Sequence, residues 1–304
     1  MLFRSYLIGR FFLVSVFILV IALLVGCGLR QQSSGSSHEI KVLHMGLIPT
    51  EDSQKMLESF KPMIAYLEKK IGIKIKPFVA ADYSGVIRAM HSKNIDFAWY
   101  GPFSYVLAAK EAGAEAFAVE VREGSGAFYK SIIVAHRDSG INTLGDIKGK
   151  TFAFVDPAST SGNLFPRAQF KKMGIDPEKD FKNAIFVGGH EAAELAVKAK
   201  KVQAAADNDI YYNLMVSKGL ISPDENKIIW ESDPIPGSPL AYRKDLPEDI
   251  KKRIKDAVLD IHKEEPATLG YIGKVLRYEE TNDEKYNVIR DVARLLDLDL
   301  RKNN

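Results

Sequence analysis

The chain has 304 residues, of which 46% are hydrophobic and 27% are charged, and its formal net charge at pH 7 is +3. This length favours two domains, and the composition is that of a globular protein with enough apolar side chains for a sizeable core. The low net charge, without clustered Lys and Arg, excludes the electrostatic footprint of a nucleic-acid-binding protein.

The N-terminus has the pattern of a secretion signal. Arg4 and Arg10 form a basic segment, and the apolar run Phe11–Val25 is broken only by Ser15. This run is shorter than the roughly 20 residues that a membrane-spanning helix needs. We therefore expect residues 1–26 to be a signal peptide, with an uncleaved anchor as the alternative.

Cys27 is the only cysteine of the chain, and it follows Leu-Val-Gly at the end of the apolar run. This arrangement resembles the lipobox of bacterial lipoproteins, in which the cysteine becomes the lipidated first residue. The alternative is an incidental cysteine. A single thiol excludes an internal disulfide. Residues 27–39 are rich in Ser, Gln and Gly and are expected to form a flexible tether.

The rest of the chain alternates strand-like and helix-like segments, which predicts an α/β fold with largely parallel sheets. The expected helices have apolar residues at helical spacing. Expected strands are 40–47, 73–79, 96–99, 116–121, 131–135, 151–155, 186–187, 204–207, 227–230 and 240–242. Expected helices are 53–70, 83–91, 103–112, 164–173, 191–200, 209–218, 248–263 and 283–296.

The segment 233–239 has three prolines in seven residues and cannot be regular structure. We interpret it as a crossover between two lobes, with crossovers near 132–142 and 231–240. The predicted boundaries are 40–135 for lobe 1, 136–236 for lobe 2, and 237–304 for a return to lobe 1.

The most informative motif is the turn Asp156–Asn163, which reads DPASTSGN. It places Ser159, Thr160 and Ser161 between a strand and a helix, beside the free N–H groups of the first helical turn. These groups favour an anion, and hydroxyls add donors without a competing charge. A simple helix cap explains any one of the three about as well. Three hydroxyls before a glycine exceed what a cap needs.

A second strand-to-helix corner carries His190 after two glycines. A histidine there can donate an N–H to an oxyanion, whose charge would keep the ring protonated. Taken alone, such a residue is more often a surface or capping histidine. Tyr83 and Tyr100 lie at similar junctions, where α/β proteins bind ligands, although core packing is an equally simple interpretation. Asp207 follows another strand and is a secondary candidate.

Signatures of enzymes and cofactors are missing from the sequence. It has no phosphate-binding glycine loop, nucleophile elbow or zinc-protease motif. The histidines show no spacing typical of metal ligands. Ser159 or Ser161 with His190 is the only nucleophile and base candidate, and no third orienting group is indicated. We therefore expect no catalytic residue, no metal and no cofactor.

Taken together, these segments resemble the substrate-binding lipoproteins of phosphonate, phosphite and phosphate ABC importers, a periplasmic-binding-protein type II family. The resemblance spans about residues 40–300. Five segments carry it: DYSGVIRAM, DFAWYGPFSY, FAFVDPASTSGNLFPR, FVGGHEAAELAV and IPGSPLAYRKDLP.

The resemblance implies a two-lobed fold with the ligand cleft between the lobes. It implies that Ser159, Thr160, Ser161 and His190 hold the phosphonyl oxygens and that Tyr83 and Tyr100 line the cleft. Members that take an aminoalkyl phosphonate carry carboxylates for its ammonium group, one of them in the segment IPGSP. This chain has Ser238 there, so only Asp207 remains to supply such a charge, which weakens the case for 2-aminoethylphosphonate.

The expected protein is therefore a monomeric, lipid-anchored, extracytoplasmic receptor. It would capture a small phosphorus oxyanion and deliver it to a membrane permease and its ATPase. Three alternatives remain. One is a receptor of the same fold for a sulfonate or a thiamine-precursor pyrimidine. The others are an anchored serine hydrolase and a sensor subunit that signals to a membrane kinase.

Overall fold

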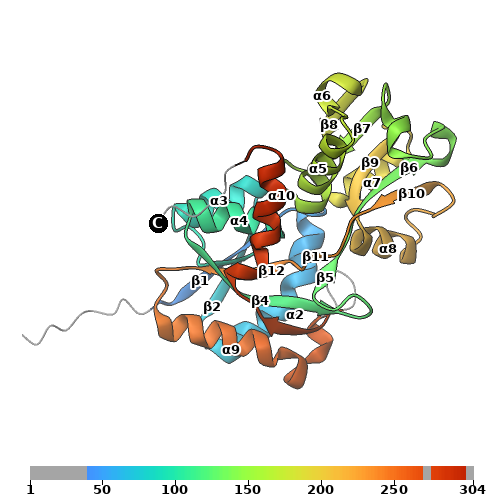
Figure 1. Ribbon diagram of the computed structural model, residues 1–304. Helices are drawn as coiled ribbons and strands as arrows, with labels where there is room; N and C mark the ends of the chain where they lie inside the picture. The colour runs from blue at the N-terminus through green and yellow to red at the C-terminus, as the bar shows by residue number, and fades with distance from the viewer. Residues whose placement is uncertain (1–39, 270–274, 299–304) are drawn as a thin grey trace, which may run out of the picture. The chain divides into compact units, whose positions relative to one another are not determined.

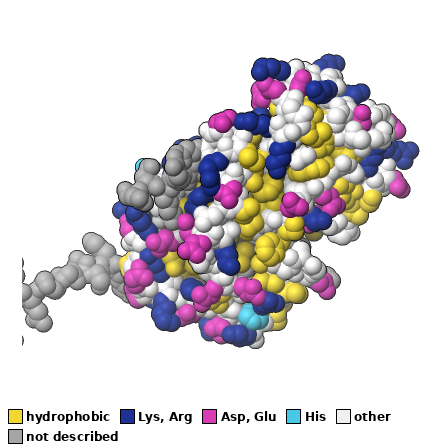
Figure 2. All heavy atoms as spheres, in the orientation of Figure 1, with side chains coloured by type: hydrophobic (Ala, Val, Ile, Leu, Met, Phe, Trp, Pro, Cys, Tyr) yellow, Lys and Arg dark blue, Asp and Glu magenta, His cyan; other side chains and the backbone are white. Residues whose placement is uncertain are grey.

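The computed structural model describes residues 40–269 and 275–298 and is shown in Figure 1. The predictions for the signal peptide, Cys27 and the tether fall on residues 1–39, outside the described residues. Within the described ranges, no helix has both the length and the apolar character needed to cross a membrane. On the face shown in Figure 2, Lys and Arg side chains are interspersed with Asp and Glu.

The first lobe is built on a six-stranded sheet in the order β13-β4-β12-β3-β1-β2. Its strands are β1 (Val42–Leu47), β2 (Lys74–Val79), β3 (Phe97–Trp99), β4 (Ala114–Arg122), β12 (Pro239–Arg243) and β13 (Val275–Glu280). Its helices are α2 (Ser53–Ile71), α3 (Tyr83–His91), α4 (Pro102–Glu111), α9 (Glu248–Glu264) and α10 (Asn287–Leu295). Strands β1, β2 and β3 are parallel, so their carboxyl ends meet at one edge of the sheet.

The second lobe is built on a five-stranded sheet in the order β10-β6-β9-β7-β8. Its strands are β6 (Ser131–His136), β7 (Thr151–Phe154), β8 (Asn183–Phe186), β9 (Ala204–Asn208) and β10 (Asn226–Glu231). Its helices are α5 (Phe165–Lys172), α6 (Pro177–Asp180), α7 (His190–Lys198) and α8 (Asp209–Ser217). The core packs Phe152, Phe154, Phe170 and Phe181 against one another.

Both sheets are mixed, whereas the sequence pattern predicted largely parallel ones. In the first sheet β12 runs antiparallel to β3 and β4, and β13 runs antiparallel to β4. In the second sheet β6 is antiparallel to β9 and β10. Parallel neighbours in a sheet require a long connection, usually a helix. A strand that enters a sheet directly from a crossover has no such connection and can pair in the antiparallel direction. Strand β13 was not predicted, because its apolar residues are few.

The crossovers pair with each other as a two-stranded ladder between β5 (Phe128–Tyr129) and β11 (Ile235–Pro236). The predicted first boundary is wrong, because β6 already belongs to the second sheet and the chain crosses before Ser131. A strand of two residues, such as β5, is too short to give a periodic signal, which explains why the predicted boundary lies one strand too late. The Ser131 N–H donates to Ser232 Oγ (3.0 Å), which ties the two crossovers together.

Candidate functional site

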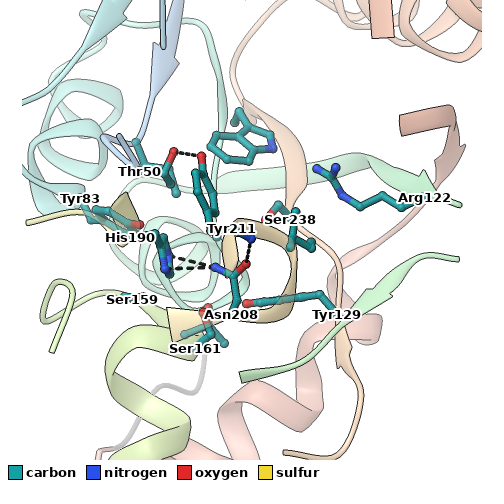
Figure 3. A pocket seen from close by; sticks show the side chains of 15 residues that line it. Thr50, Tyr83, Arg122, Tyr129, Ser159, Ser161, His190, Asn208, Tyr211 and Ser238 are labelled. Atoms are coloured by element: carbon teal, nitrogen blue, oxygen red, sulfur yellow. Dashed lines mark hydrogen bonds between the residues drawn. The ribbon is translucent and has the colours of Figure 1, made fainter. Parts of the chain in front are cut away.

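A cavity of about 40 Å³ lies between the lobes and is lined from both of them (Figure 3). Thr50, Tyr83 and Trp99 come from the first lobe, at the carboxyl ends of strands or the start of a helix. The second lobe contributes the hydroxyl turn, His190, Asn208 and Tyr211, while Arg122, Tyr129 and Ser238 come from the crossover region. This volume has room for a few atoms of the size of water oxygens.

The hydroxyl turn is a cap and a cavity wall at once. Ser159 is the N-cap of a π-helical turn (Thr160–Leu164) that continues into α5, and its Oγ accepts from the Gly162 N–H at 3.0 Å. The cap uses only an acceptor lone pair of the hydroxyl, so its hydrogen stays available for an oxyanion. A Cβ at Gly162 would lie 2.3 Å from Val155 Cγ2, which explains why glycine follows the three hydroxyls.

Thr160 connects the two lobes. Its Oγ1 accepts from the Phe103 N–H of α4 at 2.8 Å, so its hydroxyl hydrogen is also left for another acceptor. Ser161 is buried, and its carbonyl oxygen accepts from Ser131 Oγ at 2.8 Å. The Tyr129 hydroxyl lies close to the hydroxyls of Thr160 and Ser161. The three predicted hydroxyls therefore all reach the same cavity.

His190 begins α7 and lines the cavity, and Asp207 lies directly behind it rather than in the cleft. The Nδ1 atom is 2.5 Å from Asp207 Oδ1, and the Asp207 side chain is fully buried. Burial raises the pKa of Asp207 to about 8 and lowers the pKa of His190 to about 3. The pair therefore keeps one proton in its short hydrogen bond at neutral pH, and Nε2 keeps a proton of its own.

This geometry changes the expected roles of both residues. Asp207 is held behind His190 by their hydrogen bond, so it cannot face an ammonium group of a ligand. It also supplies the orienting group for His190 that the sequence did not indicate. Within the described ranges, however, no hydrogen bond joins His190 to Ser159 or Ser161. The arrangement presents a hydrogen-bond donor and lacks the nucleophile-to-base contact of a hydrolase.

Asn208 and Tyr211 were missed by the sequence-based prediction. Asn208 Oδ1 caps α8 by accepting from the Tyr211 N–H at 2.9 Å, which fixes Nδ2 near the His190 ring, 3.1 Å from Nδ1 and 3.3 Å from Nε2. The Tyr211 ring stacks on that of His190, with centroids 5.0 Å apart. The one sequence signal for Asn208 is its position between a strand and a helix, next to Asp207.

Tyr83 is buried, and its hydroxyl lies in the cavity without a hydrogen-bond partner among the described residues. A buried hydroxyl without a partner loses free energy unless a ligand or a water molecule satisfies it. Tyr100 is also buried, but its hydroxyl points toward Val86 O and Met90 Sδ inside the first lobe. Trp99 lines the cavity instead, because successive side chains at a strand end point to opposite faces.

Four further contacts join the lobes around the cavity, so the structure is a closed form. The His190 N–H donates to Thr50 O at 2.8 Å, and the Tyr83 N–H donates to Asp156 Oδ2 at 3.3 Å. The Thr50 and Tyr211 hydroxyls also share a hydrogen bond. Lys55 and Glu191 form an exposed ion pair at 2.6 Å. Closure therefore brings the donors of both lobes around one small volume.

The charges at the cavity wall are few. Arg122 is the one Lys or Arg that lines it within the described ranges, and it lies 2.5 Å from the buried carboxylate of Glu120. No Asp or Glu is among the described lining residues, and Ser238 occupies the position discussed above for an ammonium-binding acid. The wall therefore offers mainly neutral donors, which suit an acceptor-rich ligand without a cationic group.

Known proteins share both the sequence and the fold of this chain. The family described as "ABC transporter, phosphonate, periplasmic substrate-binding protein" matches residues 45–286. The phosphonates-binding periplasmic protein of Escherichia coli K12 is 35% identical over 271 residues, covering 87% of this chain and 79% of its own. The phosphate-import protein PhnD of Mycolicibacterium smegmatis is 35% identical over 237 residues, covering 74% of each chain.

A solved structure shows the same similarity. A binding protein component of an ABC phosphonate transporter from Pseudomonas aeruginosa superimposes with a TM-score of 0.78 at 31% identity. The match covers 84% of this chain and 86% of that one. The two-lobed fold that the sequence predicted is therefore confirmed.

Proposed function

The chain belongs to the family of periplasmic substrate-binding proteins of phosphonate ABC transporters, and from this we propose that it captures a small phosphorus oxyanion between its lobes. The observation that carries the ligand assignment is the convergence of the Ser159, Thr160 and Ser161 hydroxyls with His190 on one cavity. Such donors are stabilising around an acceptor-only ligand.

The size and charge of the cavity narrow the ligand. Its volume of about 40 Å³ fits an ion with at most a short substituent. Phosphite, phosphate, methylphosphonate and other small phosphonates meet this condition. An aminoalkyl phosphonate would bury its ammonium group without a carboxylate in the described lining, which is unfavourable. The relatives named above bind phosphonates or import phosphate, in agreement with this range.

A ligand panel tests this proposal. Thermal unfolding of the purified protein is measured with phosphite, methylphosphonate, phosphate, 2-aminoethylphosphonate and sulfate. A ligand at 100 times its Kd stabilises the folded state by about 2.7 kcal/mol, which raises Tm measurably. We expect shifts with the first three and smaller ones with the last two. A larger shift with sulfate or with an alkanesulfonate than with any phosphorus species would overturn the ligand assignment.

Site variants then locate the ligand. We expect His190→Ala to weaken binding by about tenfold or more, because each hydrogen bond to a charged ligand contributes about 1.5–3 kcal/mol. Ser159→Ala also removes a helix cap, which destabilises the protein by about 0.5–2 kcal/mol, so its affinity is measured well below its Tm. Calorimetry that gives unchanged affinity for both variants would remove these residues from the site.

We also propose that the chain binds without catalysis, acts as a monomer and is anchored through acylated Cys27. The absence of a Ser–His hydrogen bond among the described residues supports binding over hydrolysis, and release of phosphate from a phosphoester by the purified protein would contradict it. Two or more acyl chains give stable anchoring. A Cys27→Ser variant should leave the membrane fraction of the producing cells, and its retention there would exclude the lipid anchor.

A further inference from the structure

A second buried carboxyl group lies behind His190. Glu194 follows His190 by one turn of α7 and is fully buried. Asn226 of β10 holds it by donating from Nδ2 to Glu194 Oε2 at 2.7 Å and to the Glu194 carbonyl oxygen at 2.9 Å. Its other oxygen, Oε1, and Asp207 Oδ2 are both buried without a hydrogen-bond partner among the described residues.

These two oxygens satisfy each other if one carries a proton. Two ionised carboxylates in contact repel, whereas an acid and a carboxylate share a strong hydrogen bond. The Glu194 and Asp207 side chains are close enough to hydrogen-bond once one of them is protonated, and burial, and then the neighbouring charge of Asp207, raises the pKa of Glu194 well above its usual value. The shared proton therefore lies between Glu194 and Asp207.

No cation in the described surroundings replaces that proton. The titratable groups that act on the pair are His190 on α7, Asp209 after β9, Tyr83 on α3 and Tyr212 on α8, while β10 contributes the neutral Asn226. On β6, His136 lies near Asp138. Lys198 of α7 is turned away and donates to Leu220 O. Apart from His190, the groups that act on the pair are neutral or acidic, so they favour the protonated acid.

We propose that Glu194 is a positioning residue that shares a proton with Asp207 and so keeps His190 as an N–H donor toward the ligand. The inference rests on the proposed function and deepens it. With that proton, Glu194, Asp207 and His190 together carry no net charge. Without it, a negative charge lies behind the anion. While the proton is retained, the site binds anions. Its lack of a free negative charge makes it selective for anions without a cationic group.

The test compares Glu194→Gln and Glu194→Leu with the wild type in calorimetric titrations with methylphosphonate and phosphite between pH 6 and pH 10. Glutamine keeps both contacts, because its carbonyl accepts from Asn226 and its N–H donates to Asp207. At pH 7 we expect its affinity to lie within about threefold of the wild type. Leucine leaves Asp207 Oδ2 without a partner and removes one of the two acceptors of Asn226 Nδ2, so it should weaken binding by about 5- to 100-fold. Glu111→Gln, at the exposed end of α4 and away from the cavity, is the matched control.

The pH profile separates this role from a packing role. Wild-type affinity should fall at alkaline pH, where the shared proton is lost, because burial raises the pKa values of both Glu194 and Asp207. In Glu194→Gln this fall should begin at higher pH, since the amide cannot ionise. Superimposable profiles, or a glutamine variant as weak at pH 7 as the leucine variant, would overturn the inference. A wild type that binds neither ligand at any pH would instead overturn the proposed function.

Discussion

Replacing Asn208 by aspartate reverses one polar contact of the cavity and keeps the fold. Asn208 caps α8 through Oδ1, which accepts from the Tyr211 N–H. Aspartate has the same shape and is an equally good N-cap, so the helix should begin at the same residue. The other side-chain atom changes from an N–H donor near the His190 ring to an oxygen that carries negative charge. The substitution therefore replaces a hydrogen-bond donor at the ligand site with a negative charge that repels an anion.

The magnitude follows from Coulomb's law. Two unit charges about 4 Å apart repel by about 4 kcal/mol at an effective dielectric constant of about 20. This corresponds to a loss of affinity of about a thousandfold. Calorimetry with the best ligand of the panel measures it. Asn213→Asp makes the same charge change at an exposed position of α8 and should leave the affinity within about threefold.

The affinity of the Asn208→Asp variant should also depend on pH. Burial raises the pKa of a carboxyl at position 208, so lowering the pH should restore part of the affinity as the group becomes neutral. Retention of affinity within tenfold at pH 8, in a variant whose unfolding free energy is unchanged, would show that Asn208 does not face the ligand.

Three smaller predictions follow from single contacts. Thr160→Val leaves the Phe103 N–H unpaired in the closed form, so calorimetry should show binding about 5- to 100-fold weaker with an unaltered circular dichroism spectrum. Gly162→Ala forces a Cβ against Val155, and urea unfolding should show a loss of about 1–3 kcal/mol. Lys55→Met removes an exposed interlobe ion pair, so the affinity should change less than about threefold, and a larger change would revise the closing contacts.

The sequence predicted those parts of the site whose residue types and neighbours along the chain form a recognisable local pattern. The hydroxyl turn and His190 stand at strand-to-helix corners, and the structure brings both to one cavity with Tyr83. It could not distinguish Trp99 from Tyr100, because a one-residue change at a strand end moves a side chain to the other face. Nor could it locate Asp207 behind His190, since that contact joins two elements 17 residues apart in the chain.

The sequence could not identify the cavity residues of the crossover region, for a different reason. Tyr129 lies in a strand of two residues. Arg122 is the last residue of β4, a strand whose sequence is typical of the protein core. Neither belongs to a recognisable motif, and Tyr129 reaches the cavity from the crossover segment whose strand β5 pairs with β11. Their contribution depends on long-range pairing, which no local window of sequence records.

The hydroxyl groups of the site explain how selectivity and closure depend on the same atoms. Ser159 accepts from an N–H of its own helix, and Thr160 accepts from Phe103 of the opposite lobe. Each uses an acceptor lone pair on the protein and leaves its hydrogen for the ligand, and an acceptor-rich anion is the partner that can use it. The Thr160 contact exists only when the lobes meet. In the proposed function, ligand binding and closure are therefore coupled, and we expect opening of the lobes to release the anion, because hydroxyls bring no full charge.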